Sequence, residues 1–126
     1  MIVGLGVDVV AIDRVARAIE RPRFLERVFL PSERERIAQK GAQTAAGCFA
    51  AKEAVAKALG TGFRGFMIWD IEIVADDLGR PDVRLLGGAK ARFLALLADS
   101  MHISISHADG VACAVCVIER NGGSGI

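Results

Sequence analysis

The sequence predicts an α+β fold: a single domain in which a mainly antiparallel sheet is packed by one long buried helix and several shorter helices. A chain of 126 residues with 52% hydrophobic and 25% charged residues has the composition of one globular domain. An apolar, β-branched run opens the chain, and helical patterns follow before two hairpin patterns appear. Because the hairpins are segregated from the helices, the sheet is expected to be mainly antiparallel.

The first third of the chain predicts one strand and short helices. Residues 2–12 are almost continuously apolar, which predicts a strand buried on both faces. Asp13 is a candidate N-cap for a helix over residues 14–20, which Pro22 ends. Residues 24–29 are expected to form a short second turn.

Two further helices are predicted next. Ser32 is placed to cap a helix that begins at Pro31 and ends at Gly41, with acidic residues in its first turn. Residues 44–59 form the strongest helical pattern, because they are rich in alanine, contain no proline and are followed by Gly60.

The second half of the chain predicts strands, turns and one helix, which gives the order β-α-α-α-β-β-α-β-β. Its expected elements are a half-buried strand at 70–74, a turn at 76–79, a partner strand at 83–86, a helix at 89–98, a strand at 101–106, a turn at 107–110 and a last strand at 111–118. A domain over residues 1–120 and a loose glycine-rich tail over residues 121–126 complete the expectation.

Charge and composition exclude several classes of protein. Sixteen Lys and Arg against 15 Asp and Glu give a net charge of +1, so bulk charge does not predict nucleic-acid binding. No apolar run approaches the roughly 18 residues of a membrane helix, and the first residues do not resemble a signal peptide. Three cysteines cannot all pair within the chain. We therefore expect a cytoplasmic protein without a disulfide scaffold.

Charged residues stand out within the two most apolar segments. Asp8 lies in the middle of the first predicted strand, where an unpaired carboxylate is costly. Glu53 and Lys57 are four residues apart on a helix that is apolar nearly all round. One interpretation is a solvated salt bridge, and the other is a charged site within the fold or at an interface.

Both histidines of the chain lie in one predicted strand. His102 shares a face with Ser104 and Ser106, whereas His107 lies on the other face at the end of the strand. A Ser/His hydrolase with Asp109 is one hypothesis, although no Gly-x-Ser-x-Gly motif is present. His107 is the better candidate for contact with a ligand.

Two short motifs do not carry the chemistry they first indicate. Gly4 and Gly6 are not followed by the third glycine of a dinucleotide fingerprint, because position 9 is Val9. Such glycines are more typical of a bulge or a close backbone approach. Cys113 and Cys116 would point to opposite faces of a strand, so they are expected to be buried thiols rather than zinc ligands.

A local basic patch lies near the N-terminus. Arg14, Arg17 and Arg21 are spaced three and four residues apart, which places them on one face if the helix extends that far. A solvated face is one interpretation, and a docking face for an acidic partner is the other. Phe24 and Phe29 would then add an apolar anchor.

Three segments together resemble one family, the short bacterial class of 4′-phosphopantetheinyl transferases known as holo-[acyl-carrier-protein] synthases. The resemblance extends in order from Met1 to Glu119. It is carried by Ile-Val-Gly-Leu-Gly-Val-Asp-Val-Val-Ala-Ile-Asp-Arg at 2–14, Phe-Ala-Ala-Lys-Glu-Ala-Val-Ala-Lys-Ala-Leu-Gly-Thr-Gly at 49–62, Asp-Ile-Glu-Ile at 70–73 and Ile-Ser-Ile-Ser-His-Ala-Asp at 103–109. One departure is Cys48, where family members often carry an arginine.

The resemblance implies transfer of 4′-phosphopantetheine from coenzyme A to a serine of an apo acyl carrier protein, with release of 3′,5′-ADP. Asp8 and Glu53 would hold Mg²⁺, which also binds the pyrophosphate of coenzyme A. Glu53 and Lys57 would be the catalytic residues, with Lys57 able to protonate the departing 3′,5′-ADP. Either Glu53 or a water on the ion would take the serine proton.

The resemblance also assigns binding roles and an assembly. Lys52 and His107 would hold coenzyme A phosphates, and the loop with Gly62 would pass near the nucleotide. The arginine-rich segment (Arg14, Arg17, Arg21) with Phe24 would meet the acidic recognition helix of the carrier. The family further implies a homotrimer with active sites between subunits and a place in fatty acid biosynthesis. A non-catalytic module that binds coenzyme A or a carrier protein is the alternative.

Overall fold

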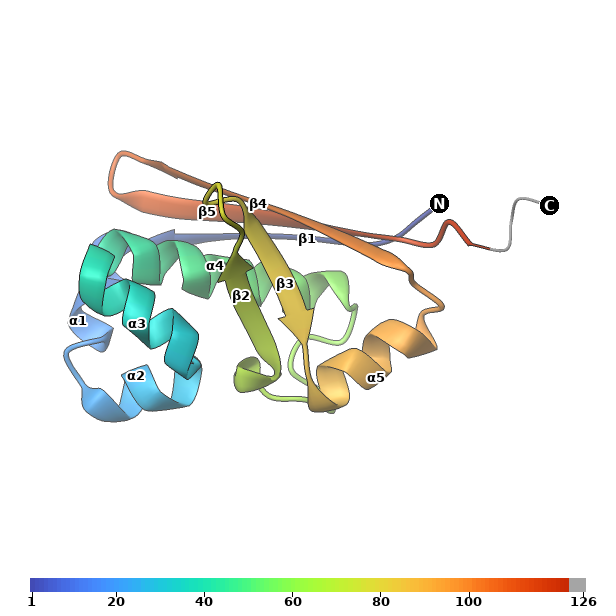
Figure 1. The fold of residues 1–126 in the computed structure, drawn as a ribbon, viewed down its shortest axis with the longest axis horizontal. Helices are drawn as coiled ribbons and strands as arrows, with labels where there is room; N and C mark the ends of the chain where they lie inside the picture. Colours follow the sequence, from blue (N-terminus) through green and yellow to red (C-terminus); the bar gives the residue numbers. More distant parts are fainter. Residues whose placement is uncertain (123–126) are drawn as a thin grey trace.

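The apolar opening run forms strand β1 (Ile2–Ala11), which is the edge of a three-stranded antiparallel sheet. The strand order is β1-β5-β4, with β5 (Val111–Glu119) in the middle and β4 (Ser100–Ala108) at the opposite edge. In this computed structural model, which describes residues 1–122, every helix lies beneath the same face of that sheet (Figure 1). The expected α+β class with a mainly antiparallel sheet is confirmed.

The long predicted helix is α4 (Ala42–Ala58), which packs against the inner face of the sheet. Glycines in β1 allow its close approach. A Cβ atom at Gly4 would lie 2.1 Å from the carbonyl oxygen of Ala58, and one at Gly6 would lie 1.9 Å from that of Ala54. The expectation that these glycines mark a close backbone contact is therefore confirmed.

The outer face of the sheet is apolar and uncovered in the single chain, so the prediction that β1 is buried on both faces is wrong. Leu5, Val7 and Val9 are 65%, 53% and 59% exposed, and Val115 of β5 extends the patch. The apolar run was interpreted as two buried faces, whereas only the face toward α4 is packed within this chain.

The short helices begin earlier than expected. Helix α1 (Ile12–Ala18) begins before Asp13, whose side chain makes no cap, so that part of the prediction is wrong. Pro22 begins helix α2 (Pro22–Val28) instead of ending its predecessor, since proline suits the first turn of a helix. The segment expected as a turn is therefore a helix, and four α-helices precede the second strand instead of three.

Helix α3 (Pro31–Lys40) is capped by a residue other than the one predicted. Its N-cap is Leu30, whose backbone N–H donates to Glu33 at 2.7 Å, while the hydroxyl of Ser32 donates to Glu72 at 2.6 Å. Ser32 therefore links α3 to the neighbouring strand. Gly41 ends the helix as predicted, in a left-handed conformation with φ of 89°.

The predicted hairpin forms a second, two-stranded sheet, which is visible below the first in Figure 1. A 3-10 turn at Ile68–Asp70 leads into β2, whose first three residues are buried, so the strand is more deeply buried than expected. The turn at 76–79 is confirmed. The remaining elements are β2 (Ile71–Ala75), β3 (Pro81–Leu85) and α5 (Gly87–Ala95).

The expected C-terminal tail begins with two residues in contact with the fold. The backbone N–H groups of Asn121 and Gly122 donate to the carboxylate of Asp99, and these bonds lower the pKa of Asp99. The other residues assigned to the tail, 123–126, lie outside the described residues. None of the helices over residues 1–122 is both long and apolar enough to cross a bilayer.

Candidate active site

Asp8, Glu53 and Lys57 come together where β1 passes helix α4. Asp8 follows Gly6 by two residues, so it also faces α4. The ammonium of Lys57 donates to Asp8 Oδ1 at 3.0 Å and to the backbone oxygen of Val7 at 2.9 Å. Lys57 thus pairs with two groups of β1, Val7 and Asp8, which lie 50 and 49 positions away from it in the chain.

Within this cluster, the pKa of Glu53 is shifted from its ordinary value. Burial raises the pKa of Glu53, the nearby charge of Asp8 raises it further, and Lys57 acts in the opposite direction. The Lys57 side chain is 53% exposed, while that of Asp8 is 16% exposed. The charge of Asp8 disfavours ionisation of Glu53, so a cation bound between the two carboxylates would relieve their repulsion.

The donor set of the cluster fits a hard divalent cation. Asp8 and Glu53 offer only carboxylate oxygens, which are the ligands that Mg²⁺ uses, typically through one or two carboxylates plus substrate phosphates and water. Within residues 1–122 no group of three His, Cys, Asp or Glu side chains is placed to hold a metal ion without further ligands.

A basic hollow of about 520 Å³ adjoins the cluster. Phe49 lies one turn before Glu53 on α4, and Val10 lies two residues after Asp8 on β1, so the hollow continues the same two stripes. The residues around it come from β1, α1, α2, α4 and the α1–α2 connection: Val10, Arg14, Val15, Arg17, Ala18, Arg21, Phe24 and Phe49.

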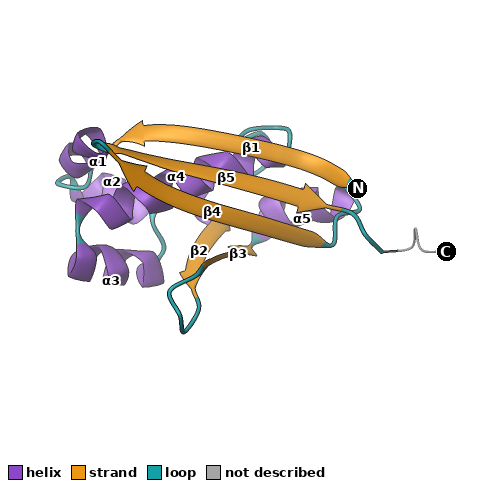
Figure 2. Cartoon of the chain, turned by 90° about the horizontal axis from the view of Figure 1, so that it is seen from above, coloured by secondary structure: helices purple, strands orange, loops and turns teal. Residues whose placement is uncertain are grey.

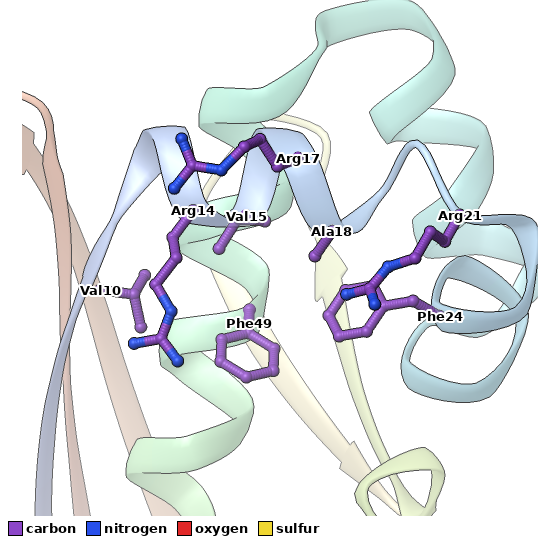
Figure 3. Close-up of a pocket in the computed structure, with 8 residues that line it drawn as sticks. All are labelled: Val10, Arg14, Val15, Arg17, Ala18, Arg21, Phe24 and Phe49. Atoms are coloured by element: carbon purple, nitrogen blue, oxygen red, sulfur yellow. The ribbon is translucent and has the colours of Figure 1, made fainter.

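The three arginines of the hollow are not equivalent. Figure 3 shows the guanidinium of Arg14 beside Phe49 and that of Arg21 against Phe24, whereas Arg17 extends from the other side of α1. The Phe24 and Phe49 ring centroids lie 6.1 Å apart, which forms an apolar floor between positive charges. Phe29 belongs to the core instead, because it is only 1% exposed.

Lys52 does not reach this surface. Its side chain is fully buried, and its ammonium contacts Glu33 at 2.7 Å and the backbone oxygen of Ile71 at 2.6 Å. The expectation that Lys52 holds a coenzyme A phosphate is therefore wrong: its charge is already neutralised and no face of the ammonium is open to solvent. Lys57 lies five positions further along the chain, which places the two lysines on different sides of α4.

His107 lies at the other edge of the sheet. It belongs to β4, and its Nε2 atom lies 3.0 Å from the backbone oxygen of Gln43. Together with Arg36 and Lys40 of α3, His107 lines a second cavity of about 270 Å³. Because β1 and β4 are the two edges of the sheet, one chain does not bring His107 to Asp8. Figure 2 shows these edges from above.

The loop with Gly62 follows α4 directly and so begins one turn beyond Lys57. Gly60 and Gly62 have φ values of 84° and 60°, which non-glycine residues rarely adopt, and they turn the chain sharply. Arg92 of α5 donates to the backbone oxygen of Leu59 at 2.8 Å and holds the start of this loop. The loop therefore lies at the Lys57 end of the charged cluster.

The register of β4 excludes the hydrolase hypothesis. Ser104 and Ser106 face the outer side of the sheet, opposite Val115 and Cys113, whereas the His107 ring contacts α4 on the inner side. A serine and a histidine on opposite faces cannot share a hydrogen bond. The cysteines at 113 and 116 alternate between faces as predicted and are free thiols, but only Cys116 is buried, whereas Cys113 is half-buried on the outer face.

Sequence reasoning missed Phe49, Arg36 and Lys40. Phe49 could have been found, because it lies four residues before Glu53 on a predicted helix. Arg36 and Lys40 lie on α3 and meet His107 of β4 only through tertiary packing. No spacing within the chain signals that contact.

Comparisons with known proteins identify the family of the chain. The sequence profile described as "4′-phosphopantetheinyl transferase superfamily" matches residues 4–116. The holo-[acyl-carrier-protein] synthase of Solidesulfovibrio magneticus is 50% identical, covering 94% of this chain and 99% of that protein. The one from Clostridium novyi is 46% identical, covering 97% and 92%.

Solved structures show the same fold. Holo-[acyl-carrier-protein] synthase from Helicobacter pylori, in complex with coenzyme A, superposes with a TM-score of 0.81 at 35% identity and covers 91% of this chain and 99% of its own. The Neisseria meningitidis protein has a TM-score of 0.83 at 34% identity, with coverage of 95% and 100%.

Proposed function

The chain belongs to the 4′-phosphopantetheinyl transferase superfamily, in its holo-[acyl-carrier-protein] synthase group, and we propose that it moves phosphopantetheine from coenzyme A to a serine of an apo acyl carrier protein. The serine hydroxyl gives its proton to Glu53 or to a water at the site, and its oxygen forms a bond to the β-phosphorus of coenzyme A. The bond from that phosphorus to the bridging oxygen breaks, and 3′,5′-ADP leaves. The observation that carries this proposal is the meeting of Asp8, Glu53 and Lys57 beside an arginine-lined hollow.

We assign the magnesium ligands to Asp8 and Glu53. When bound, Mg²⁺ supplies positive charge to the pyrophosphate of the substrate. Lys57 is exposed enough to turn from Asp8 toward a substrate phosphate, where its ammonium can stabilise the leaving group and give it a proton. The remaining contribution of the chain is to hold these charges in place before the substrates arrive.

The arginine hollow is the proposed docking surface for the carrier protein. Arg14 and Arg21 would pair with acidic side chains, while Phe24 and Phe49 would receive an apolar one. Because the hollow continues the stripes that carry Asp8 and Glu53, a carrier docked there can present its serine to the cluster. Arg17, which extends away from the phenylalanines, is expected to contribute less.

We further propose a homotrimer with active sites between subunits. The exposed apolar face of the sheet is a surface that soluble proteins usually cover. Copies that bury this face would also let the β4 edge of one chain approach the β1 edge of the next. His107 and its basic cavity would then complete the site around Asp8, and Gly62 would lie near the nucleotide. With acyl carrier protein as substrate, the fitting setting is fatty acid biosynthesis in the cytoplasm.

The test is intact-protein mass spectrometry of apo acyl carrier protein after incubation with this protein, coenzyme A and Mg²⁺. The expected result is a mass gain of one phosphopantetheine and release of 3′,5′-ADP, both abolished by EDTA. Mass photometry of the same sample checks the trimer. Coenzyme A binding without any mass gain on several carriers would favour a non-catalytic binding module.

A further inference from the structure

The ring of His107 lies in a space that exists only because residue 47 has no side chain. A Cβ atom at Gly47 would lie 2.9 Å from His107 Nε2, 3.3 Å from its Cε1 and 3.0 Å from Cγ2 of Ile105. Gly47 is buried within α4 and has no positive φ, so the backbone itself does not require glycine. Glycine inside a helix is less favourable than alanine. A side chain at this position would crowd the His107 ring and Ile105.

The hydrogen bond of the ring defines which nitrogen carries a proton. His107 Nε2 lies 3.0 Å from the carbonyl oxygen of Gln43, and a carbonyl oxygen can only accept. Nε2 is therefore the donor, both in the neutral ring and in the imidazolium. The other nitrogen, Nδ1, is left for whatever enters the cavity that Arg36 and Lys40 line.

We propose that Gly47 is a positioning residue for His107: the missing side chain holds the ring against α4 with its Nε2–H on the Gln43 carbonyl, so that Nδ1 faces the cavity and, in the imidazolium form, donates to a phosphate of coenzyme A. The ligand part of this inference depends on the proposed function. The geometric part concerns this chain alone, and it can be tested without any substrate.

The expected effect of Gly47→Ala is displacement of the ring rather than loss of the fold, because two of the three crowded atoms belong to the imidazole. Nitrogen NMR of the His107 ring in the free protein should show a pure Nε2–H tautomer in the parent and a mixture in the variant. The KM for coenzyme A should rise about tenfold, which is the scale of one lost hydrogen bond to a charged group, with a smaller change in kcat.

Two further variants separate positioning from a general helix effect. Gln43→Ala changes an exposed side chain one turn away and keeps the carbonyl that His107 uses, so tautomer and KM should match the parent. In a His107→Asn background, Gly47→Ala should cause no further rise in KM. The double variant thus tests whether Gly47 acts through His107.

Several results would overturn the inference. A parent protein whose His107 carries its proton on Nδ1 contradicts it directly, even if Gly47→Ala fails to fold. So does an unchanged tautomer in Gly47→Ala, or an equal rise in KM with and without His107. If the parent transfers no phosphopantetheine, the proposed function fails, while the NMR result still decides how Gly47 and His107 are related.

Discussion

Two lysines on the same helix form ion pairs of almost the same length but have different roles, one in holding the fold together and one at the candidate site. Lys52 lies 2.7 Å from Glu33, and both side chains are fully buried. Lys57 lies 3.0 Å from Asp8, and the pair is open to solvent. The distances alone would not distinguish them. Burial does: the first pair can only hold the structure together, whereas the second can exchange its partner for a ligand.

The buried pair of Lys52 and Glu33 also fixes the orientation of α4, which the packing of α4 against β1 does not do by itself. At Gly4 and Gly6 of β1, α4 approaches through Ala58 and Ala54, and residues this small allow a close approach but do not interlock. Glu33 accepts from Lys52 and from the backbone N–H of both Leu30 and Ile73. This carboxylate therefore fixes α4 relative to α3 and β2, and so fixes the angle at which Glu53 and Lys57 face β1.

The largest expected effect is on stability, from Lys52→Met. Removing the ammonium leaves Glu33 charged and buried, which typically costs about 3–5 kcal/mol in free energy of unfolding. Urea unfolding measures the loss. The double variant Glu33→Gln with Lys52→Met should recover part of it, because no buried charge remains. A loss below about 1 kcal/mol for Lys52→Met would show that the buried pair is not the structural one.

Glu53→Gln is expected to separate activity from stability. Transfer should fall by about 10²–10³-fold, the scale of losing one preorganised electrostatic group at a reacting centre. Mass spectrometry of the carrier under single-turnover conditions measures that fall. Retention of full Mg²⁺-dependent transfer would refute the metal role of Glu53.

The same variant should be more stable than the parent in metal-free buffer near neutral pH. The pKa of Glu53 is raised above its ordinary value of 4.5 by burial and by Asp8. Its ionised form therefore weakens the folded state, and the penalty grows as pH rises through the raised pKa. The Tm advantage of Glu53→Gln should shrink as the pH falls and vanish below 4.5. An advantage that is independent of pH would point to another cause.

Lys57→Ala is expected to leave stability within about 1 kcal/mol of the parent, as is usual for an exposed ion pair. Transfer should nevertheless drop by about 10²-fold, because a proton donor to the leaving group is lost. Thermal unfolding and the carrier assay on one preparation give both quantities. A large stability loss with normal transfer would reverse the roles assigned to the two lysines.

The smallest expected effects concern carrier docking. Arg14→Glu and Arg21→Glu should each raise the KM for the carrier about tenfold or more, with a weaker effect at high salt. Arg17→Glu is the comparison variant, since its side chain extends from the other side of α1, away from Phe24 and Phe49, and should change KM less. Equal effects of all three would indicate long-range attraction rather than a docking contact.

The sequence predicted the architecture well where a periodic pattern is long. The long helix and both hairpins follow from alternation, glycines and alanine content, and the predicted element order lacks only the short helix α2 and the 3-10 turn before β2. The short helices near Pro22 were harder, because proline both ends and begins helices. The exposed face of β1 could not be predicted, since an apolar run looks alike whether its second face meets this chain or another.

Part of the candidate site was predictable, because two of its charged residues lie within apolar segments. Asp8 and Glu53 stand out because each interrupts an apolar segment, and the structure brings them together with Lys57. The burial of Lys52 was not predictable. Its partner Glu33 lies 19 positions earlier in the chain, on a helix whose orientation the sequence does not reveal. Neighbouring charges in a motif therefore need not share an environment.

The glycine contact of β1 with α4 has a consequence for how such a protein can change over generations. Any substitution at Gly4 or Gly6 adds at least one carbon, and that carbon would overlap a backbone oxygen of α4. Backbone cannot move aside as the ring beside Gly47 can. Every substitution at these two positions is therefore expected to destabilise the fold. A random library screened only for folding should return glycine at both.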